Sequence, residues 1–243
     1  MIALLDADIL VYRVGFTTQD APESLARVRM DELILNILAD LQTQEYVCVL
    51  SPTGKNSFRY RIYPEYKANR KAPKPVHYAI LRDYLIDTHA AQIPEDLEAD
   101  DGLGLLSTEL NNPELGHTPI IVSIDKDLNQ IPGWHYNFVN KIKYYMDELE
   151  AKKSFYIQLL MGDVSDNIPG IPGLGIVKAT RIIDPCTTEE QMREEVRHIY
   201  QDHFKSGADA ILERNQQLIK IRYKTWQNQE ANKKSSGPPW RHW

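Results

Sequence analysis

Residues 98–101 (Glu-Ala-Asp-Asp) place three carboxylates within four residues and lead into a leucine-rich run at 103–110. The spacing of these leucines predicts a helix that starts at residues 98–101 and buries one face. Acidic residues at a helix N-terminus are favourable in themselves, because they complement the helix dipole. On one helical turn they also repel one another. The segment therefore indicates either a solvated helix start or a cation-binding site.

Pairs of closely spaced aspartates recur beside other apolar segments, and this repetition favours the cation site. The pairs are Asp6/Asp8, Asp125/Asp127 and Asp163/Asp166. Carboxylates packed this closely need cations, and ligand sets made only of oxygen atoms suit Mg²⁺ or Mn²⁺. The cysteines form no CxxC pair and the histidines no HExxH pattern, which argues against zinc.

Apolar runs along the first half of the chain predict an α/β fold with a mostly parallel sheet and flanking helices. Residues 2–5 form a short apolar run, residues 24–44 carry apolar side chains at helical spacing, and residues 46–50 form a second short run. A strand, a helix and another strand make a βαβ unit, in which the two strands are parallel.

A third buried strand is predicted at residues 118–124, directly before Asp125. The first apolar run also stops at an aspartate, Asp6. In open α/β sheets, sites lie at the carboxyl ends of the strands. We therefore expect Asp6 and Asp125 to converge although they are distant in sequence.

Residues 55–82 carry eight Lys and Arg residues against one acidic residue, Glu65, although the formal net charge of the chain is −6. The overall charge therefore does not exclude a partner that carries phosphate. Residues 58–63 alternate like a strand, and the cations that follow are interleaved with Tyr66. The segment is either a solvated loop before a helix at 77–88, or a basic strip that binds a nucleic-acid backbone while Tyr66 stacks on a base.

The second half of the chain is predicted to be helical, with helices at 147–161, 188–204 and 209–226. Residues 227–243 have the composition of a flexible tail. No apolar run approaches the length of a membrane span, and the N-terminus has no secretory signal. Together with the unpaired cysteines, these features predict a cytoplasmic protein without a membrane partner, and we expect a monomer.

A glycine-rich segment, residues 162–183, separates the first two of these helices. Gly173 and Gly175 permit a tight hairpin that opens into a helix bearing Lys178 and Arg181. Free amides at such a helix start bind anions, and a duplex phosphate fits this site. A glycine hairpin is more often a simple turn, but the aspartates just before it favour the binding site.

In this order, the motifs resemble those of the 5′-nuclease superfamily: flap endonucleases, the 5′-nuclease domain of bacterial DNA polymerase I, and phage 5′→3′ exonucleases, which are the most similar. The matching segments are residues 5–13, 66–71, 97–101, 123–127 and 162–175.

The resemblance implies three regions. Residues 1–146 would form a PIN-like α/β nuclease core that includes a helical arch at 66–92, through which a free 5′ end passes. Residues 147–226 would form a helical duplex-binding region with a helix–hairpin–helix-like element at 162–183, followed by the tail.

The resemblance also assigns site residues. Two or more Mg²⁺ or Mn²⁺ ions would be held by Asp6, Glu98, Asp100, Asp101, Asp125, Asp127, Asp163 and Asp166. Catalytic cations at the scissile phosphate would be Arg13, Lys67 and Arg70. DNA would be contacted by Tyr66, Lys71, Lys74, Lys178 and Arg181. A potassium ion at the hairpin would bind the carbonyl groups of Gly170 and Leu174.

The implied function is metal-dependent hydrolysis of DNA near a free 5′ end, in phage replication or recombination within a host cytoplasm, with a replication protein bound to the tail. One position departs from the family pattern, because the second strand is followed by Ser51 where relatives place an aspartate. This departure motivates a second hypothesis, a catalytically impaired relative that only binds branched DNA.

Two more functions are compatible with parts of the sequence. The aspartates at 6 and 8, Ser51, and residues 162–166 also resemble the motifs of haloacid-dehalogenase-type phosphatases. A phosphatase leaves the acids at 98–101 and the basic strip unexplained. A relative that cuts RNA is compatible as well, since no feature of the sequence reads a 2′-hydroxyl.

Overall fold

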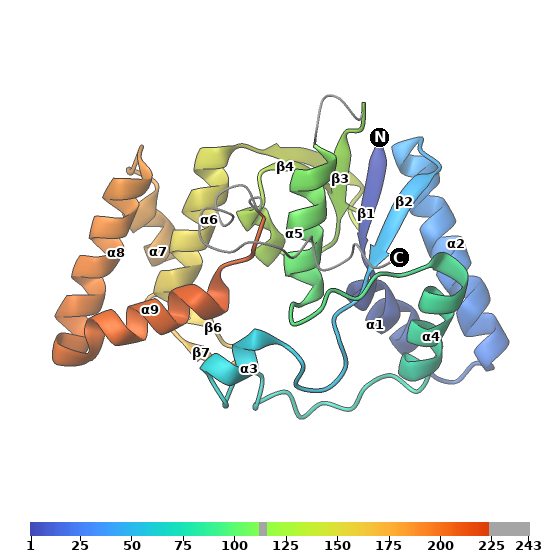
Figure 1. The fold of residues 1–243 in the computed structure, drawn as a ribbon, viewed down its shortest axis with the longest axis horizontal. Coiled ribbons are helices and arrows are strands. Elements are labelled where there is room, and N and C mark those ends of the chain that lie inside the picture. Colours follow the sequence, from blue (N-terminus) through green and yellow to red (C-terminus); the bar gives the residue numbers. More distant parts are fainter. Residues whose placement is uncertain (112–115, 224–243) are drawn as a thin grey trace, which may run out of the picture.

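The computed structural model describes residues 1–111 and 116–223, and a five-stranded sheet lies at its centre (Figure 1). The strands are β1 (Ile2–Asp6), β2 (Glu45–Val49), β3 (Pro119–Val122), β4 (Gly133–Asn137) and β5 (Ile142–Met146), in the spatial order β2-β1-β3-β4-β5. All neighbouring pairs are parallel except β4 and β5. The predicted α/β class with a mostly parallel sheet is confirmed.

Helices cover both faces of the sheet, because successive residues of a strand point to opposite sides. Ala3 and Leu5 of β1 belong to one core, with side chains from α1 (Ala7–Thr17), α2 (Glu23–Leu41) and α4 (Tyr78–His89). Leu4, between them, belongs to the core on the opposite face, with side chains from α5 (Ala99–Leu110). The carboxyl ends of β1 and β3 therefore meet at one edge between the two layers.

A second core lies beside the sheet and is helical, as predicted (Figure 1). It is built by α6 (Glu148–Met161), α7 (Ile176–Ile183), α8 (Glu189–Phe204) and α9 (Ala208–Ile219). The start of α6 is fixed by Asp147, whose carboxylate accepts the first free amides. The start of α8 is fixed by a capping box between Thr188 and Gln191.

A two-stranded sheet of β6 (Gly162–Asp163) and β7 (Ile168–Pro169) connects α6 to α7. Gly162 has a φ of +69°, and a Cβ atom there would lie 2.2 Å from the Gly170 nitrogen. Only glycine fits this crossing of two backbones. Gly175 caps the start of α7, as predicted.

Two predictions for the basic strip are wrong. Residues 58–62 form a helix, α3 (Phe58–Ile62), and not a strand. The alternating pattern is too short to specify a strand. Ser57 favours a helix instead, because its hydroxyl caps the helix by accepting a hydrogen bond from the Arg59 amide. In the predicted arch at 66–92, residues 66–77 form turns and extended backbone, so the segment is helical only from α4 onwards.

Two further elements differ from prediction. No strand is predicted for residues 133–146, which form β4 and β5. The last described helix, α9, ends at Ile219, well before residue 226. It ends there because the following backbone is held by long-range hydrogen bonds: the amide of Ile221 donates to Gln130 Oε1, and that of Arg222 donates to Asp101 Oδ1.

The short 3₁₀ helices are η2 (Asp127–Gln130) and η3 (Lys205–Gly207). Within the described ranges, no helix is both long enough and apolar enough to cross a membrane. The predicted tail at 227–243 lies outside the described residues.

Candidate active site

Carboxylates from three separate segments converge at the carboxyl end of the sheet. Asp6 is the last residue of β1, Asp125 follows β3, and Glu98 and Asp100 begin α5. Together with Asp8, these side chains line a cavity of about 430 Å³. The convergence expected from the ends of the strands is therefore present.

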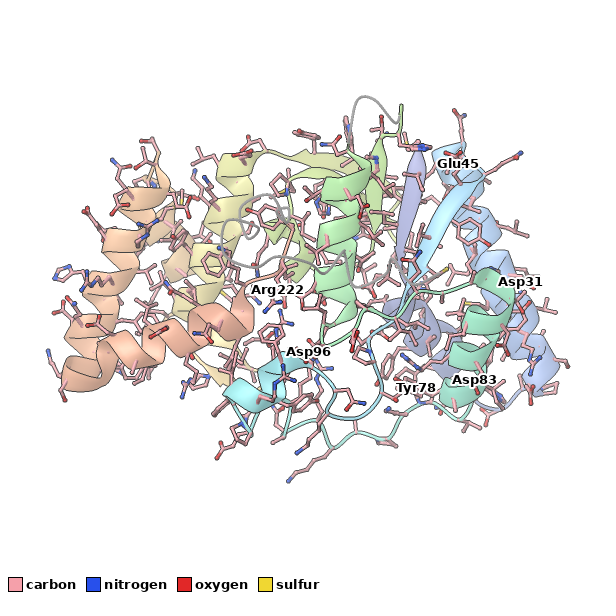
Figure 2. The ribbon with its side chains drawn as sticks, viewed as in Figure 1. Asp31, Glu45, Tyr78, Asp83, Asp96 and Arg222 are labelled. Atoms are coloured by element: carbon pink, nitrogen blue, oxygen red, sulfur yellow. The ribbon has the colours of Figure 1, made fainter. Side chains whose placement is uncertain are left out.

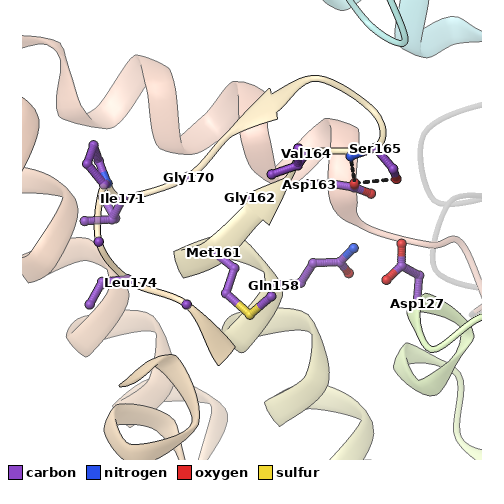
Figure 3. Close-up of a pocket in the computed structure, with 13 residues that line it drawn as sticks. Asp127, Gln158, Met161, Gly162, Asp163, Val164, Ser165, Gly170, Ile171 and Leu174 are labelled. Carbon is purple, nitrogen blue, oxygen red and sulfur yellow. Dashed lines mark hydrogen bonds between the residues drawn. The ribbon is translucent and has the colours of Figure 1, made fainter. Parts of the chain in front are cut away.

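A second group of carboxylates continues this site towards the helical region. Asp127, Asp163 and Asp166 line a small space together with Glu98 and Asp100. Asp127 and Asp163 also border a cavity of about 660 Å³ at the glycine hairpin, which Gln158 lines as well (Figure 3). The acidic side chains thus form a continuous band, called here the carboxylate band: Asp6, Glu98, Asp100, Asp125, Asp127, Asp163 and Asp166.

The charges of the carboxylate band are poorly solvated. Burial raises the pKa of Asp6 to about 7, although a hydrogen bond from the Ser123 hydroxyl (2.7 Å) opposes this shift. Burial, and then the charge of Asp125, raise the pKa of Asp127 to about 7. The pKa of Asp100 is raised well above its usual value by burial and by the charges of Asp6 and Asp125. Such crowding disfavours the ionised carboxylates unless positive charge lies among them.

The oxygen-only character of the carboxylate band fits hard divalent cations. Within the described part of the chain, however, no three acidic, histidine or cysteine side chains are grouped closely enough to form a ready-made metal site. Positive charge comes instead from side chains: Lys67 Nζ lies 2.8 Å from Glu98 Oε1 and 3.7 Å from Asp166 Oδ2. Arg70 also pairs with Asp166. The band therefore needs cations, and side chains supply part of that charge.

Lys67 and Arg70 lie beside the acidic site, and their predicted role at the scissile phosphate stays a prediction. Burial lowers the pKa of Lys67, but the charges of Glu98 and Asp166 raise it more, so the amine stays protonated. Both cations line the cavity that contains Asp6 and Asp100. They are positioned to attract a phosphate group that enters this cavity.

Asp101 differs from the other acids of residues 98–101, and its predicted role as a metal ligand does not agree with its contacts. Its side chain is fully buried, and its carboxylate forms a two-point ion pair with Arg59, with Nη2 and Oδ1 3.0 Å apart. It also accepts hydrogen bonds from the amides of Glu98 and Arg222. The Asp101 carboxylate thus connects α5 to α3 and to the backbone that follows α9.

Tyr66 is also placed differently from the prediction that it stacks on a base. It is only 2% exposed and packs in the helical core. Its hydroxyl lies 2.8 Å from Glu98 Oε2 and 2.7 Å from Asp166 Oδ2, and donates to one of them at a time. The ring is therefore inaccessible to a nucleotide, and the hydroxyl positions two carboxylates.

Arg13 does not line the cavity of the carboxylate band. Its guanidinium group lies over the ring of Phe138, 5.7 Å from the ring centroid, so the predicted contact with a scissile phosphate is not present. Tyr12, Tyr60 and Tyr78 do line the cavity, and the ring centroids of Tyr12 and Tyr78 are 5.4 Å apart. Lys74, predicted to contact DNA, lies over the Tyr78 ring at 4.0 Å from its centroid.

Figure 2 shows Tyr78 at the start of α4. Lys71, the other predicted DNA contact of the basic strip, is exposed. Sequence reasoning missed Tyr12, Tyr60 and Tyr78 as cavity residues. The signal was available for Tyr12, because it lies one helical turn after Asp8.

Ser51 lies two residues after the end of β2, where the resemblance leads us to expect an aspartate. Its amide donates to Asp8 Oδ2 (2.9 Å), and its hydroxyl accepts the Ala99 amide at the start of α5 (2.9 Å). Arg82 donates to the other Asp8 oxygen (2.9 Å) and to the Ser51 carbonyl (2.6 Å). Both Asp8 oxygens therefore accept hydrogen bonds within the protein. The sequence analysis did not identify the buried Arg82 as a site residue, because its partners are distant in sequence.

The glycine hairpin presents Lys178 and Arg181 on the exposed side of α7. Lys178 Nζ donates to the carbonyl of Gly173 (2.9 Å), so an ammonium group already binds one hairpin carbonyl. Gly170 and Leu174, the predicted potassium ligands, line the hairpin cavity (Figure 3). Lys178 and Arg181 are therefore accessible beside the hairpin, and their contact with a duplex stays a prediction.

Residues 1–156 match the family described as 5′-3′ exonuclease, N-terminal resolvase-like domain. A 5′-3′ exonuclease of Buchnera aphidicola subsp. Schizaphis graminum is 28% identical over 233 residues, which cover 87% of this chain and 79% of that protein. The flap endonuclease Xni of Shewanella pealeana is 31% identical over 185 residues, covering 69% and 68%. A DNA polymerase I of Bacillus caldotenax is 27% identical over 228 residues, but only 25% of the polymerase is covered.

Solved structures from bacteriophage T5 share the fold. A T5 flap endonuclease in a pseudo-enzyme-product complex with DNA and metal ions superposes with a TM-score of 0.66 at 19% identity, covering 91% of this chain and 89% of that one. A T5 5′-exonuclease with bound zinc gives a TM-score of 0.63 at 18% identity, with coverage of 91% and 89%.

Proposed function

Because the chain belongs to the 5′-3′ exonuclease family, we propose that it hydrolyses phosphodiester bonds of DNA near a free 5′ end, with divalent metal ions as cofactors. The observation that carries this proposal is the carboxylate band, in which buried acids with raised pKa values converge from distant segments beside Lys67 and Arg70. Acids so placed would repel a phosphate unless cations neutralised them. Family membership leaves the phosphatase hypothesis without support.

Seven carboxylates of the band are the proposed metal-holding groups, and Asp101 is not among them. When bound, divalent ions supply the charge that activates a water molecule and stabilises the departing oxygen. Mg²⁺ or Mn²⁺ fits the oxygen-only ligands. Asp101 and Arg59 would keep α5 in place, so that Glu98 and Asp100 face the cavity.

Lys67 and Arg70 would bind the phosphate oxygens next to the bond that breaks. Charge develops on these oxygens during hydrolysis, and fixed cations stabilise it most where water is excluded. Lys67 is mostly buried, with a side chain 17% exposed, whereas that of Arg70 is 53% exposed. We therefore assign the larger catalytic contribution to Lys67 and an initial phosphate contact to Arg70.

The remaining contacts would place the strand. Tyr12 and Tyr78 offer aromatic faces on which the terminal base would stack. They would thereby replace Tyr66 in the stacking role first predicted for it. Lys71 and Lys74 would hold the backbone of the strand, and Lys178 and Arg181 would hold the duplex.

Several finer features belong to the same proposal. We divide the chain into a core at 1–146 and a duplex-binding region at 147–226; separate hydrophobic cores on the sheet and among the helices support this division, although Tyr66 of the first region packs in the helical core. A potassium ion would bind at Gly170 and Leu174. The protein would act as a monomer in the cytoplasm, that of a host if a phage encodes it, in replication or recombination. A replication protein would bind residues 227–243.

The test is digestion of duplex, flap and single-stranded DNA labelled at either the 5′ or the 3′ end. With Mg²⁺ or Mn²⁺, we expect short labelled products from the 5′-labelled strands only, and none in excess chelator. Short products from the 3′ label would refute the polarity, and cleavage in chelator would refute the metal dependence. Matching RNA strands test whether the enzyme cuts RNA instead.

A second candidate function is supported by one observation, the contacts at Ser51. Ser51 stands where the resemblance predicts a carboxylate, and the Asp8 carboxylate is hydrogen-bonded to Arg82 and to the Ser51 amide. The site therefore has fewer carboxylates available for metal ions than the resemblance predicts. A relative that binds branched DNA but cuts it poorly would have this feature. Binding of flap DNA with no cleavage in either metal would favour that function.

A further inference from the structure

The basic segment 65–70 and the loop 163–167 are joined by hydrogen bonds from both sides. The amide of Lys67 donates to the carbonyl of Asp166 (2.9 Å). The Asn167 side chain donates to the carbonyl of Glu65 (2.8 Å), and the Asn69 side chain donates to the carbonyl of Val164. We call this set of contacts the clip. It connects segments that lie about a hundred residues apart in the sequence.

Both halves of the clip contain a backbone conformation that side-chain-bearing residues rarely adopt. Lys67 has a φ of 56° and Asn167 a φ of 60°. Such left-handed conformations are unfavourable for most residues, and asparagine tolerates them better than lysine. The conformation of Lys67 therefore has to be held by its surroundings, and its own amide is one member of the clip.

The loop half of the clip is continuous with the glycine hairpin. Loop 163–167 joins β6 to β7, where Gly162 packs directly on Gly170. The Ile171 amide then donates to the carbonyl of Leu160 at the end of α6 (2.8 Å). Asp163 closes the loop itself, by accepting the amide and hydroxyl of Ser165 (Figure 3). A duplex held by the hairpin is thus mechanically connected to this loop.

The other half of the clip carries the two cations of the cavity. Arg70 Nε donates to the carbonyl of Ser165 (3.2 Å), and its guanidinium group pairs with Asp166. Lys67 reaches Glu98 and Asp166 from the same segment. Among residues 1–111 and 116–223, the side chains of Asn69 and Asn167 bond only to backbone carbonyls and line none of the cavities that contain the carboxylate band.

We propose that Asn69 and Asn167 are positioning residues that fix the distance between the duplex on the hairpin and the cations Lys67 and Arg70. The clip thereby determines which phosphate, counted from the duplex, enters the carboxylate band. This inference rests on the proposed nuclease function. It differs from a role in folding, because it predicts a change in where the strand is cut.

The test uses variants that remove the side-chain donors and keep the backbone geometry. Asn167→Gly deletes the amide and still permits the positive φ. Asn69→Ala deletes the other donor, and Asn69→Gln keeps one for rescue. The matched control is Asn140→Gly, which removes an exposed amide in the turn between β4 and β5, where Asn140 bonds only locally to Ile142.

The substrate is a duplex with a 5′-labelled single-stranded overhang, cut in Mn²⁺. We expect one dominant product length from the wild type and from the control. In the double variant Asn69→Ala/Asn167→Gly, the products should spread over several lengths, and kcat should fall by about 10²-fold. KM for the duplex should stay within twofold of the control, and the thermal midpoint within about 3 °C of it. Asn69→Gln in place of Asn69→Ala should restore the single product length.

Unchanged product lengths in the double variant would overturn the inference, even if kcat fell. A parallel loss of thermal stability and of activity, with the cutting position retained, would also overturn it, because it would make the clip merely structural. A wild type that cuts no DNA would instead overturn the proposed function, and the inference with it.

Discussion

Replacing Asp6 by asparagine should stabilise the metal-free protein and abolish its activity. Asp6 is only 3% exposed at the end of β1, and its burial raises its pKa from 3.8 to about 7. One pKa unit corresponds to about 1.36 kcal/mol. The ionised carboxylate therefore lowers the free energy of unfolding by about 4 kcal/mol at high pH, and asparagine removes this penalty without changing the side-chain shape.

The pH dependence gives this prediction its sign. The pKa of Asp6 is higher in the folded protein than in the unfolded chain, so the unfolded chain loses its proton first as pH rises. The penalty is therefore absent below pH 3.8, grows from there to about pH 7, and is complete above it. Between about pH 5 and about pH 8, the stability advantage of Asp6→Asn should grow by about 2–3 kcal/mol.

Urea unfolding in chelator at these two pH values measures the effect, with Asp20→Asn at an exposed site as the matched control. Saturating Mn²⁺ should stabilise the wild type more than Asp6→Asn and so reduce or reverse the difference. If Asp6→Asn is no more stable than the wild type at about pH 8 in chelator, Asp6 is not a desolvated charge and the reasoning fails.

Three further substitutions test other parts of the site. Arg59→Met leaves Asp101 buried without its partner and should lower the free energy of unfolding by about 3–5 kcal/mol; a loss below about 1 kcal/mol in urea contradicts the buried pair. Lys67→Ala should lower kcat by about 10²-fold while duplex affinity in chelator stays nearly constant; equal losses would make Lys67 only a backbone contact. Ser51→Asp should add a carboxylate to the cavity and tighten Mn²⁺ binding in calorimetry; unchanged binding would exclude this position as a ligand.

The convergence of acids was predictable from sequence because it depends on strand ends. Short apolar runs that stop at Asp6 and before Asp125 fix where those carboxylates lie in a parallel sheet. The hairpin was predictable for a similar reason, since Gly173 has a positive φ that favours glycine and Gly175 caps the start of α7. Local patterns are sufficient in both cases.

Pairings between distant segments could not be predicted in this way. Arg59 lies 42 residues from Asp101 in the sequence, and nothing local distinguishes it from the exposed Arg61 nearby. The cationic neighbours of Tyr66 indicate a surface position, whereas its ring completes the helical core. The β4–β5 hairpin was missed although Trp134 and Tyr136 alternate as in a strand.

The most direct test of the carboxylate band is crystallography of the protein with bound Mn²⁺, with anomalous scattering to locate the ions. We predict anomalous peaks between Asp100 and its neighbours Asp6 and Asp125, with Asp101 still paired to Arg59. Ions found only elsewhere on the surface, or an Asp101 that leaves Arg59 to bind an ion while Asp6 and Asp125 bind none, would contradict the metal-binding role of the band.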